Sequence, residues 1–283
     1  MQPNEASEPL NSSLSLRAQR ATLEASDGPG SPSEPATLPP LPPPAFIDVH
    51  SHLLYAIDDG CQNLHDSLAC VRALLDHGFV GSICTPHVWP DAFPLNRPIN
   101  IARWVERLRD EMRDAALDYA VWTGGEVRLT PDIVNWMQEH GVPTLGPSNY
   151  VLTDYWGYEW EYFINASLRW LVDHGYRPIF AHPERLNLRD EFDSRLKPLE
   201  EMGVLLQGNF RSATGEEGPS AAARFRKLMT QGRYQLLALD MHGPESLSGR
   251  FRGLLQTTAE YGEARIRELT QRLPRELLGI PTS

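Results

Sequence analysis

The sequence predicts an α/β fold, a closed TIM-like barrel built from seven β-then-α units. From residue 45 onward, short apolar runs alternate with longer segments of helical periodicity. Most of the apolar runs lack the polar alternation of a half-exposed strand, as expected for parallel strands that are buried on both faces. No break in this order marks the start of a second core. These observations favour a barrel, with an open doubly wound sheet as the alternative.

The seven strand candidates are separated by intervals long enough for a helix. They are FIDVH (46–50), GSICTP (81–86), YAVWTGGEV (119–127), YVLTDY (150–155), RPIFAHP (177–183), VLLQGNF (204–210) and YQLLALD (234–240). None is followed by G-x-G-x-x-G or G-x-x-x-x-G-K-[ST], which weakens the doubly wound alternative and argues against nucleotide binding.

Helical periodicity occupies the intervals between these strands and follows the last of them. The predicted helices lie near 62–77, 98–117, 130–140, 159–174, 190–202, 219–232 and 250–273. Asn63 is expected to cap the first helix. Thr130 is expected to cap the third, because Pro131 then occupies the first helical position.

Residues 1–44 differ from the rest of the chain in composition. They hold ten of the 24 prolines, together with many Ser, Ala and Glu residues, and show no hydrophobic periodicity. We expect a disordered, proline-rich tail whose last part is extended polyproline II, a spacer rather than an SH3 ligand. Residues 45–283 are expected to form a single barrel domain.

Charge and cysteine usage exclude several classes of protein. A net charge of −11 argues against a basic face that binds nucleic acid. The three cysteines form no C-x-x-C pair, which predicts free thiols in a reducing compartment. No stretch of about 18 apolar residues and no secretory signal stand out, so we expect no membrane insertion and a cytoplasmic location. An oligomer is compatible with the sequence.

Four of the nine histidines have a structural explanation. His77, His140 and His174 each stand directly before a glycine, which is typical of the last turn of a helix and its left-handed cap. His65 falls in the first turn of a predicted helix and is expected to be exposed.

The other five histidines lie at predicted strand ends, where four acidic residues join them. The nine residues are His50, His52, Asp59, His87, Glu126, Asp154, His182, Asp240 and His242. In a parallel barrel the carboxyl ends of all strands face one mouth, so these side chains should converge there. Carboxylates packed together repel one another unless cations separate them. Imidazole and carboxylate without thiolate suit Zn, Mn or Fe, and nine ligands imply two or three ions. The strand candidate 204–210 ends in Gln-Gly-Asn and offers no evident ligand.

The ordered motifs resemble a known superfamily. They are HSH (50–52), IDDG (57–60), TPH (85–87), GGEV (124–127), AHPER (181–185) and LDMH (239–242). In order and spacing they are similar to the polymerase-and-histidinol-phosphatase (PHP) superfamily. Within it they resemble the manganese-dependent bacterial tyrosine phosphatases of capsule and exopolysaccharide loci. The resemblance covers about residues 45–245 and implies a distorted (β/α)7 barrel, the PHP fold.

The resemblance also implies roles for the nine residues. His50, His52, Glu126 and Asp240 would surround a first metal. Glu126 would bridge to a second metal, held also by Asp154 and His182. Asp59, His87 and His242 would hold a third. Arg185 would bind the substrate phosphate, and Arg185 and Asp59 are the expected catalytic residues.

Three departures from the family pattern qualify this assignment. The family has glutamate where Asp154 stands, and its usual small residue is replaced by Leu239. The segment after His242 lacks the asparagine-rich continuation of the family, which leaves Arg250 as a mere candidate for a second phosphate-binding arginine.

Hydrolysis of phosphotyrosine by a metal-activated hydroxide is the activity that these residues imply. The resemblance implies a phosphotyrosine protein as substrate, namely the tyrosine-rich tail of a capsule-type tyrosine autokinase. The cysteines do not support a thiol mechanism, because none has an arginine six residues later. A small-molecule phosphomonoesterase, such as a histidinol-phosphate phosphatase, is one alternative. A catalytically weak regulatory or binding protein is the other.

The stretch YWGYEWEYF (155–163) opens at the end of a predicted strand, close to the mouth. Its aromatic rings could stack against a phosphotyrosine ring, or they could pack the next helix onto the barrel. The sequence leaves both explanations open.

Overall fold

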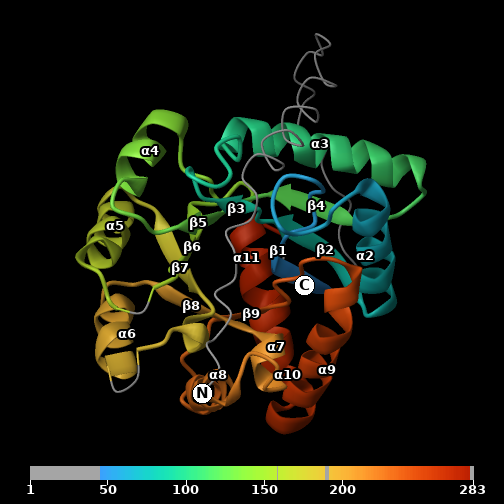
Figure 1. Cartoon of the computed structure of the whole chain (residues 1–283). Helices are drawn as coiled ribbons and strands as arrows, with labels where there is room; N and C mark the ends of the chain where they lie inside the picture. Colours follow the sequence, from blue (N-terminus) through green and yellow to red (C-terminus); the bar gives the residue numbers. More distant parts are fainter. Residues whose placement is uncertain (1–44, 158, 189–190, 281–283) are drawn as a thin grey trace, which may run out of the picture.

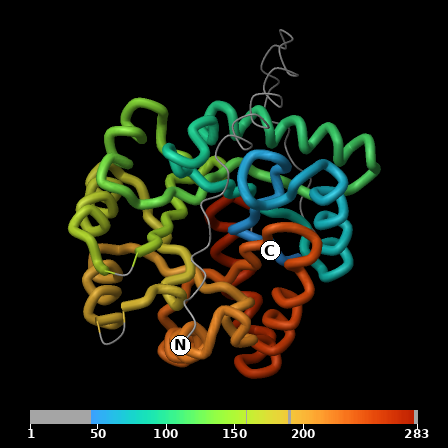
Figure 2. The backbone as a smooth tube through the Cα atoms, in the orientation of Figure 1, coloured from blue at the N-terminus to red at the C-terminus, as the bar shows by residue number. Residues whose placement is uncertain are grey.

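A computed structural model describes residues 45–157, 159–188 and 191–280 as a ring of parallel strands surrounded by helices (Figures 1 and 2). The predicted tail, residues 1–44, lies outside this described part. None of the helices in the described part combines the length and apolarity that a membrane span requires.

The strands form two parallel sheets, with the orders β1-β2-β4 and β3-β5-β6-β7-β8-β9. Their bounds are β1 Phe46–Ser51, β2 Phe79–Cys84, β3 His87–Val88, β4 Ala120–Thr123, β5 Glu126–Arg128, β6 Tyr150–Asp154, β7 Arg177–Ala181, β8 Leu205–Asn209 and β9 Leu236–Ala238. β2 pairs with β4, and β3 pairs with β5. β2 and β3 therefore share one strand position of the barrel, and β4 and β5 share the next. Each strand position, interrupted or not, is called a stave below. In the described part of the chain, the two sheets together make one ring of seven staves, the number that the sequence predicts.

Two glycines make the interruption between β4 and β5 possible. The single strand predicted over 119–127 is wrong, because β4 and β5 are separated by Gly124 and Gly125. A Cβ on Gly124 would lie 2.8 Å from the Ile83 side chain, and one on Gly125 would lie 2.7 Å from that of a nearby valine. The stave bends against its neighbour here, and any side chain would push the two apart. The strand predicted over 81–86 is also shifted, since β2 begins two residues earlier and ends before the break.

The ring closes between β9 and β1 beyond the end of β9. Ser51 forms an isolated parallel bridge with Met241. The Asp240 amide donates to the His50 carbonyl at 2.9 Å, and the His52 amide donates to the Met241 carbonyl at 3.0 Å. Closure therefore brings the chain after β9 alongside the histidines that end β1.

Helices cover the outside of the ring, except for α11, which lies inside it. Their bounds are α2 Leu64–Asp76, α3 Pro98–Asp114, α4 Ile133–His140, α5 Tyr162–Asp173, α6 Phe192–Glu201, α7 Phe210–Ala213, α8 Pro219–Thr230, α9 Pro244–Tyr261, α10 Glu263–Arg267 and α11 Leu273–Leu278, with the short helices η1 Pro183–Arg185 and η3 Glu268–Arg272. Asn63 caps α2 as predicted, by accepting from the Asp66 amide. Thr130 is not the cap of α4, which begins only at Ile133.

The single helix predicted over 250–273 is wrong. α9 ends at Tyr261, and Gly262 then adopts a φ of +85°, which turns the chain back toward the barrel. This conformation favours glycine, and helical periodicity continues on both sides of it, so the pattern by itself conceals the turn.

The core has two parts. The larger part lies between the helices and the outside of the strands. The smaller part combines inward side chains of the strands, such as Ile47 and Val49, with Leu273, Leu277 and Leu278 of α11. Figure 1 shows α11 in the middle of the ring. The end of the described chain therefore fills the barrel interior, and the polar mouth lies at the opposite ends of the strands.

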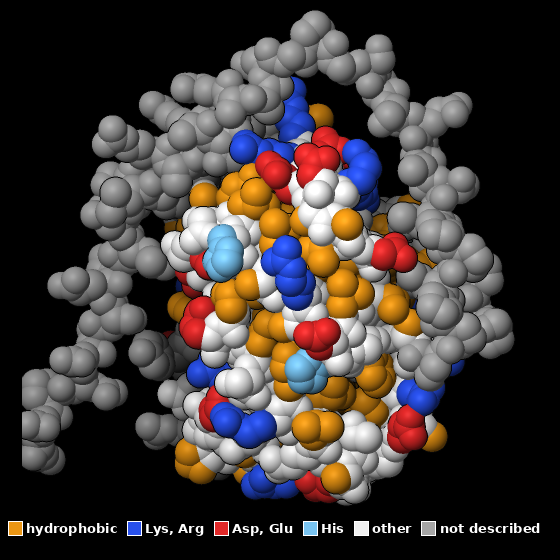
Figure 3. Space-filling model, turned by 90° about the vertical axis from the view of Figure 1, so that its right-hand side faces the viewer, with side chains coloured by type: hydrophobic (Ala, Val, Ile, Leu, Met, Phe, Trp, Pro, Cys, Tyr) orange, Lys and Arg blue, Asp and Glu red, His pale blue; other side chains and the backbone are white. Residues whose placement is uncertain are grey.

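On the face that carries α2 and α9, hydrophobic side chains alternate with charged ones of both signs (Figure 3). Leu255 of α9 is one of the few large hydrophobic side chains that are strongly exposed.

Candidate metal centre

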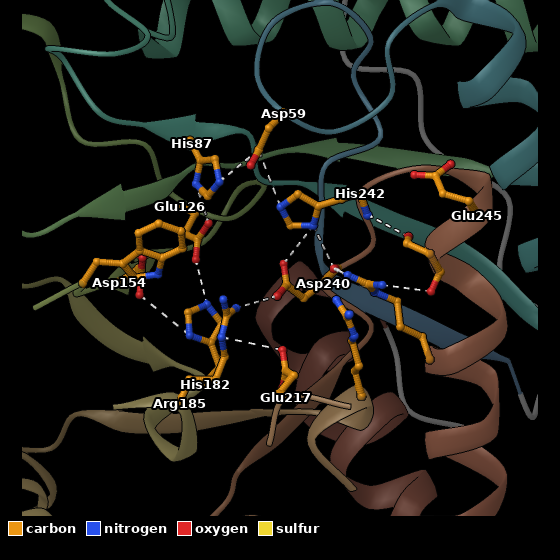
Figure 4. A pocket seen from close by; sticks show the side chains of 14 residues that line it. Asp59, His87, Glu126, Asp154, His182, Arg185, Glu217, Asp240, His242 and Glu245 are labelled. Carbon is orange, nitrogen blue, oxygen red and sulfur yellow. Dashed lines mark hydrogen bonds and ion pairs between the residues drawn. The ribbon is translucent and has the colours of Figure 1, made fainter. Parts of the chain in front are cut away.

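All nine predicted ligands lie together at the carboxyl ends of the strands. His50 is the last residue but one of β1, and His52 directly follows that strand. β3 begins with His87, β5 begins with Glu126, and β6 ends in Asp154. His182 follows β7, Asp240 and His242 follow β9, and Asp59 comes from the loop after β1. Figure 4 shows seven of these side chains around one cavity, which measures about 390 Å³.

The first group consists of His50, His52, Glu126 and Asp240. His50 Nε2 lies 3.4 Å from Glu126 Oε2 and 3.3 Å from Asp240 Oδ1. His52 Nε2 lies 3.5 Å from each of the same two oxygens. Ligands about 2.1 Å from a tetrahedral metal are separated by roughly 3.4 Å, so these spacings match a shared ion.

The second group consists of Glu126, Asp154 and His182. His182 Nε2 lies 3.0 Å from Glu126 Oε1, and His182 Nδ1 lies 3.7 Å from Asp154 Oδ1. Glu126 thus presents one oxygen to the first group and the other to the second. The shorter arm of Asp154, compared with the glutamate of the family, still reaches this group.

The third group consists of Asp59, His87 and His242, beside His52. Asp59 Oδ1 lies 3.2 Å from His87 Nε2 and 3.6 Å from His242 Nε2. Each of these four residues offers one ligand atom, and the four atoms all lie within 4.8 Å of one another.

Two buried oxygens indicate that a cation belongs in this cavity. Glu126 Oε2 and Asp59 Oδ1 are buried, and neither accepts a hydrogen bond from the described residues, although His87 Nδ1 and Nε2 lie 2.8 and 3.2 Å from them outside hydrogen-bond geometry. A buried carboxylate oxygen without a donor is costly unless a cation faces it. The donor set, imidazole nitrogen and carboxylate oxygen, fits divalent metal ions such as Mn, Zn or Fe.

The charges in the cavity depend on one another. Burial opposes ionisation of Glu126, but the imidazoles of His50, His87 and His182 together outweigh it and hold the pKa of Glu126 well below its usual range. Burial also opposes a charge on His87, yet the Glu126 and Asp59 carboxylates together raise the pKa of His87 to about 10. Burial and the neighbouring His52 lower the pKa of His242 to about 4. In the metal-free protein, protons on imidazoles thus balance part of the carboxylate charge, and a divalent ion would displace them.

A second layer of side chains orients the ligands, and sequence reasoning missed it. Asp58 Oδ2 lies 2.8 Å from His52 Nδ1 and accepts from the His87 amide at 3.0 Å. Gln207 Oε1 lies 2.9 Å from His50 Nδ1. Asn209 donates to Asp240 Oδ2 at 2.8 Å. The other ring nitrogen of a metal-binding histidine is commonly held in this way.

The strand candidate 204–210, for which the sequence predicts no evident ligand, contributes two of these orienting side chains. Gln207 and Asn209 stand at i and i+2 at the end of β8, the same spacing as the two histidines that end β1. Side chains at this spacing point to one side of a strand, and that signal could have identified them. Asp58 is adjacent to a predicted ligand, and its position in the sequence gave no means to tell the two aspartates apart.

Arg185 lies at the edge of the cavity between two acids. Its Nη1 donates to Asp240 Oδ2 at 3.2 Å, and its Nε lies 3.6 Å from Glu217 Oε1. The preceding Glu184 is fully buried and accepts from the Asn209 amide and from the Tyr234 hydroxyl. These bonds fix the short helix η1 and aim Arg185 at the cavity (Figure 4).

Arg250, the candidate for a second phosphate-binding arginine, has a structural role in this conformation. It is 3% exposed and donates to the carbonyls of Leu239, Asp240 and Ser246. Asp240 has a φ of +50°, an unfavourable conformation for a non-glycine residue. Arg250 therefore stabilises the strained turn that carries this ligand candidate.

Some aromatic residues of the stretch 155–163 pack against one another, and another faces the cavity. Tyr155, Trp160 and Phe163 pack together, with Tyr155 buried and its hydroxyl bonded to the Glu159 carbonyl. Trp156 is 55% exposed and lines the metal cavity. Residue 158 lies outside the described residues.

The other four histidines lie at helix ends or on the surface, as predicted, and the cysteines are free thiols. His77 and His174 each contact the carbonyl four residues earlier through Nδ1, at 2.8 Å, at the ends of α2 and α5. His140 is the last residue of α4, and His65 is exposed. The three cysteines are free and buried.

Comparisons with known proteins agree with this geometry. The model of the family described as "Capsular polysaccharide synthesis, CpsB/CapC" matches residues 46–279. The tyrosine-protein phosphatase CpsB of Streptococcus pneumoniae is 25% identical over 239 residues, which is 82% of this chain and 98% of the relative. The tyrosine-protein phosphatase YwqE of Bacillus subtilis is 27% identical over 202 residues, covering 70% of this chain and 77% of the relative.

Solved structures confirm the fold. Crystal structures of YwqE from Bacillus subtilis and CpsB from Streptococcus pneumoniae, described as unique metal-dependent tyrosine phosphatases, align with a TM-score of 0.73 at 24% identity over 84% of this chain and 96% of the matched chain. A phosphotriesterase homology protein from Escherichia coli aligns with a TM-score of 0.54 at 12% identity over 84% of this chain and 100% of its own. The distorted barrel predicted from the sequence is confirmed.

Proposed function

The chain belongs to the capsular polysaccharide synthesis family CpsB/CapC, and from this premise we propose that it is a metal-dependent protein-tyrosine phosphatase. The observation that carries the proposal is that two imidazole nitrogens each lie 3.3 to 3.5 Å from a Glu126 oxygen and an Asp240 oxygen, with Arg185 beside them at an open mouth. Relatives of this chain named tyrosine-protein phosphatases support the choice of substrate.

We assign the ligands by the three groups. The first group would hold one ion, the second group would hold another through the bridging Glu126, and the third group would complete a set of two or three. Manganese is the metal we propose, because oxygen and imidazole ligands suit it and the sequence motifs resemble manganese-dependent phosphatases.

A divalent ion bound here would lower the pKa of a water molecule and neutralise charge on the phosphoryl group. Arg185 would bind two phosphoryl oxygens through its guanidinium fork, held in position by Asp240 and Glu217. Burial opposes ionisation of Asp59, but His87 outweighs it and holds the pKa of Asp59 low. Asp59 is therefore ionised at neutral pH, and through Oδ1 it would help to hold the ion that activates the attacking water.

The substrate we propose is phosphotyrosine in the tail of a tyrosine autokinase of capsule or exopolysaccharide synthesis. The family description supports a place in capsule synthesis. The exposed Trp156 supports an aromatic leaving group, since its ring can pack against the phenyl ring. The free, buried cysteines support a reducing compartment, and we place the protein in the cytoplasm.

The test compares three substrates: a phosphotyrosine peptide, histidinol phosphate and p-nitrophenyl phosphate, each with manganese and with chelator. A phosphatase of the proposed kind prefers the peptide and loses activity with chelator. Preference for histidinol phosphate would instead support a small-molecule phosphomonoesterase. Turnover that is equally low for all three substrates, and the same with manganese and with chelator, would support a regulatory protein.

Elemental analysis tests the ligand assignment separately. We expect His50→Ala combined with Asp240→Ala to lose bound metal. His174→Ala serves as the control, because His174 contacts a helix carbonyl far from the cavity. Metal content unchanged in the double variant would refute the assignment.

A further inference from the structure

A second cleft adjoins the metal cavity. It measures about 450 Å³ and is lined by Arg128, Tyr155, Trp156, Gly157, His182, Arg185, Leu186 and Asn187. Trp156, His182 and Arg185 line both cavities, so the two form one continuous depression. A substrate whose phosphate enters the metal cavity would place its remaining parts in or beside this second cleft.

Arg128 is the charged group that distinguishes the second cleft. Its guanidinium lies 4.1 Å from the ring centre of Trp89 and 5.4 Å from that of Trp156. Its Nη2 makes one long hydrogen bond, 3.4 Å, to the Trp156 carbonyl. Burial lowers the pKa of Arg128, although an arginine keeps its charge in proteins. Among the described residues it forms no ion pair within 4 Å; the Asp154 and Glu126 carboxylates act on it only from a longer distance, and its direct neighbours are two indoles.

The position of Arg128 indicates which part of a substrate it meets. Glu126 and Arg128 are two residues apart on β5 and point to the same side of the strand. Arg128 therefore stands roughly 7 Å farther along the strand than the metal ligand Glu126. That step is comparable to the distance from the phosphate of phosphotyrosine to the peptide backbone, so groups next to the phosphorylated residue reach Arg128.

We propose that the second cleft binds the peptide around the phosphotyrosine, with Trp156 against the phenyl ring and Arg128 paired with an acidic side chain one or two residues away. The inference rests on the proposed function and makes it more specific: the preferred substrates are phosphotyrosine peptides with a neighbouring Asp or Glu. A guanidinium already oriented by two indoles loses little side-chain entropy when it binds a carboxylate. Arg185 adds a second positive charge at the border of the same cleft.

The first experiment uses the manganese-loaded protein and phosphotyrosine peptides that differ only in Glu or Gln at one position, −2, −1, +1 or +2. At one of these positions we expect kcat/KM for the Glu peptide to exceed that for the Gln peptide by about fivefold, a modest ratio because the cleft is open to solvent. The ratio should fall as sodium chloride is raised. Equal rates for all Glu and Gln pairs would overturn the inference while leaving the phosphatase activity intact. Failure to hydrolyse any of the peptides would instead overturn the proposed function.

The second experiment repeats the Glu-to-Gln comparison in variants. The ratio measured within one variant is independent of any general loss of activity, and Arg128→Gln should bring it to about one. Arg177→Gln is the matched control, because Arg177 lies 4.5 Å over the Tyr150 ring but at the start of β7, the opposite end of the barrel from the site. An unchanged ratio in Arg128→Gln, or an equal loss in Arg177→Gln, would overturn the inference.

Discussion

The hydrogen bond between Gln207 and His50 links the end of β8 to the end of β1, and its removal should weaken metal binding. Gln207 is fully buried, and its Oε1 lies 2.9 Å from His50 Nδ1. Its Nε2 donates to the Asn209 side chain at 2.9 Å, and Asn209 in turn bonds to Asp240. Gln207→Leu keeps most of the volume and removes both bonds that the Gln207 side chain makes to His50 and Asn209.

The size of the effect follows from what the variant leaves behind. His50 loses the acceptor that fixes its ring, and Asn209 loses a donor next to the first group. Loss of such an orienting partner weakens metal affinity by about 10- to 100-fold, which corresponds to roughly 1.4 to 2.7 kcal/mol. The buried, unpaired groups should also lower the free energy of unfolding of the metal-free protein by about 1 to 3 kcal/mol.

Isothermal titration of metal-free protein with manganese measures the affinity directly. Gln235→Leu is the control, because Gln235 accepts from the Leu206 amide at 2.8 Å but stands before β9, away from the cavity. It should lose stability and keep its manganese affinity. If Gln207→Leu bound manganese as tightly as the unmodified protein, the orienting role of this glutamine would be refuted.

Three further predictions follow from the structure. Arg185→Gln should lower kcat/KM for a phosphotyrosine peptide about 100- to 1000-fold, as expected when a donor to the phosphoryl group is removed, and manganese affinity should change far less; a comparable loss of affinity would contradict this role. In chelator, the Glu126 and Asp59 carboxylates together outweigh burial and raise the pKa of His87 to about 10, above its unfolded value of 6.5. The contribution of His87 to stability is therefore complete below pH 6.5 and is lost as the pH rises through 10. Urea unfolding of the metal-free protein at pH 6 and pH 10.5 tests this, and equal midpoints would speak against it. Gly253→Ala should destabilise the protein by at least about 1 to 3 kcal/mol, because the new Cβ would overlap the Phe210 backbone, whereas at Gly249 it meets only a movable glutamate side chain; thermal unfolding of both variants should show the difference.

The sequence by itself determined the number of staves and the position of the site. Apolar runs and helical patterns are local, and each run ends in the polar residue that the mouth of a barrel requires. The five histidines and four acids were found in this way, because each lies at the end of a predicted strand or in the loop that follows it. The three helix-end histidines could be set aside for the same reason, since the following glycine is a local signal.

Only the tertiary structure decided how these residues are held. Gln207 and His50 are 157 positions apart, so no local pattern joins them. Asp58 and Asp59 are neighbours in the chain, and only packing against His52 assigns one to orientation and the other to the third group. The turn at Gly262, which returns α11 into the barrel, likewise depends on contacts with distant strands. Local periodicity specifies elements and their ends, whereas hydrogen bonds between distant elements require the closed ring in which they form.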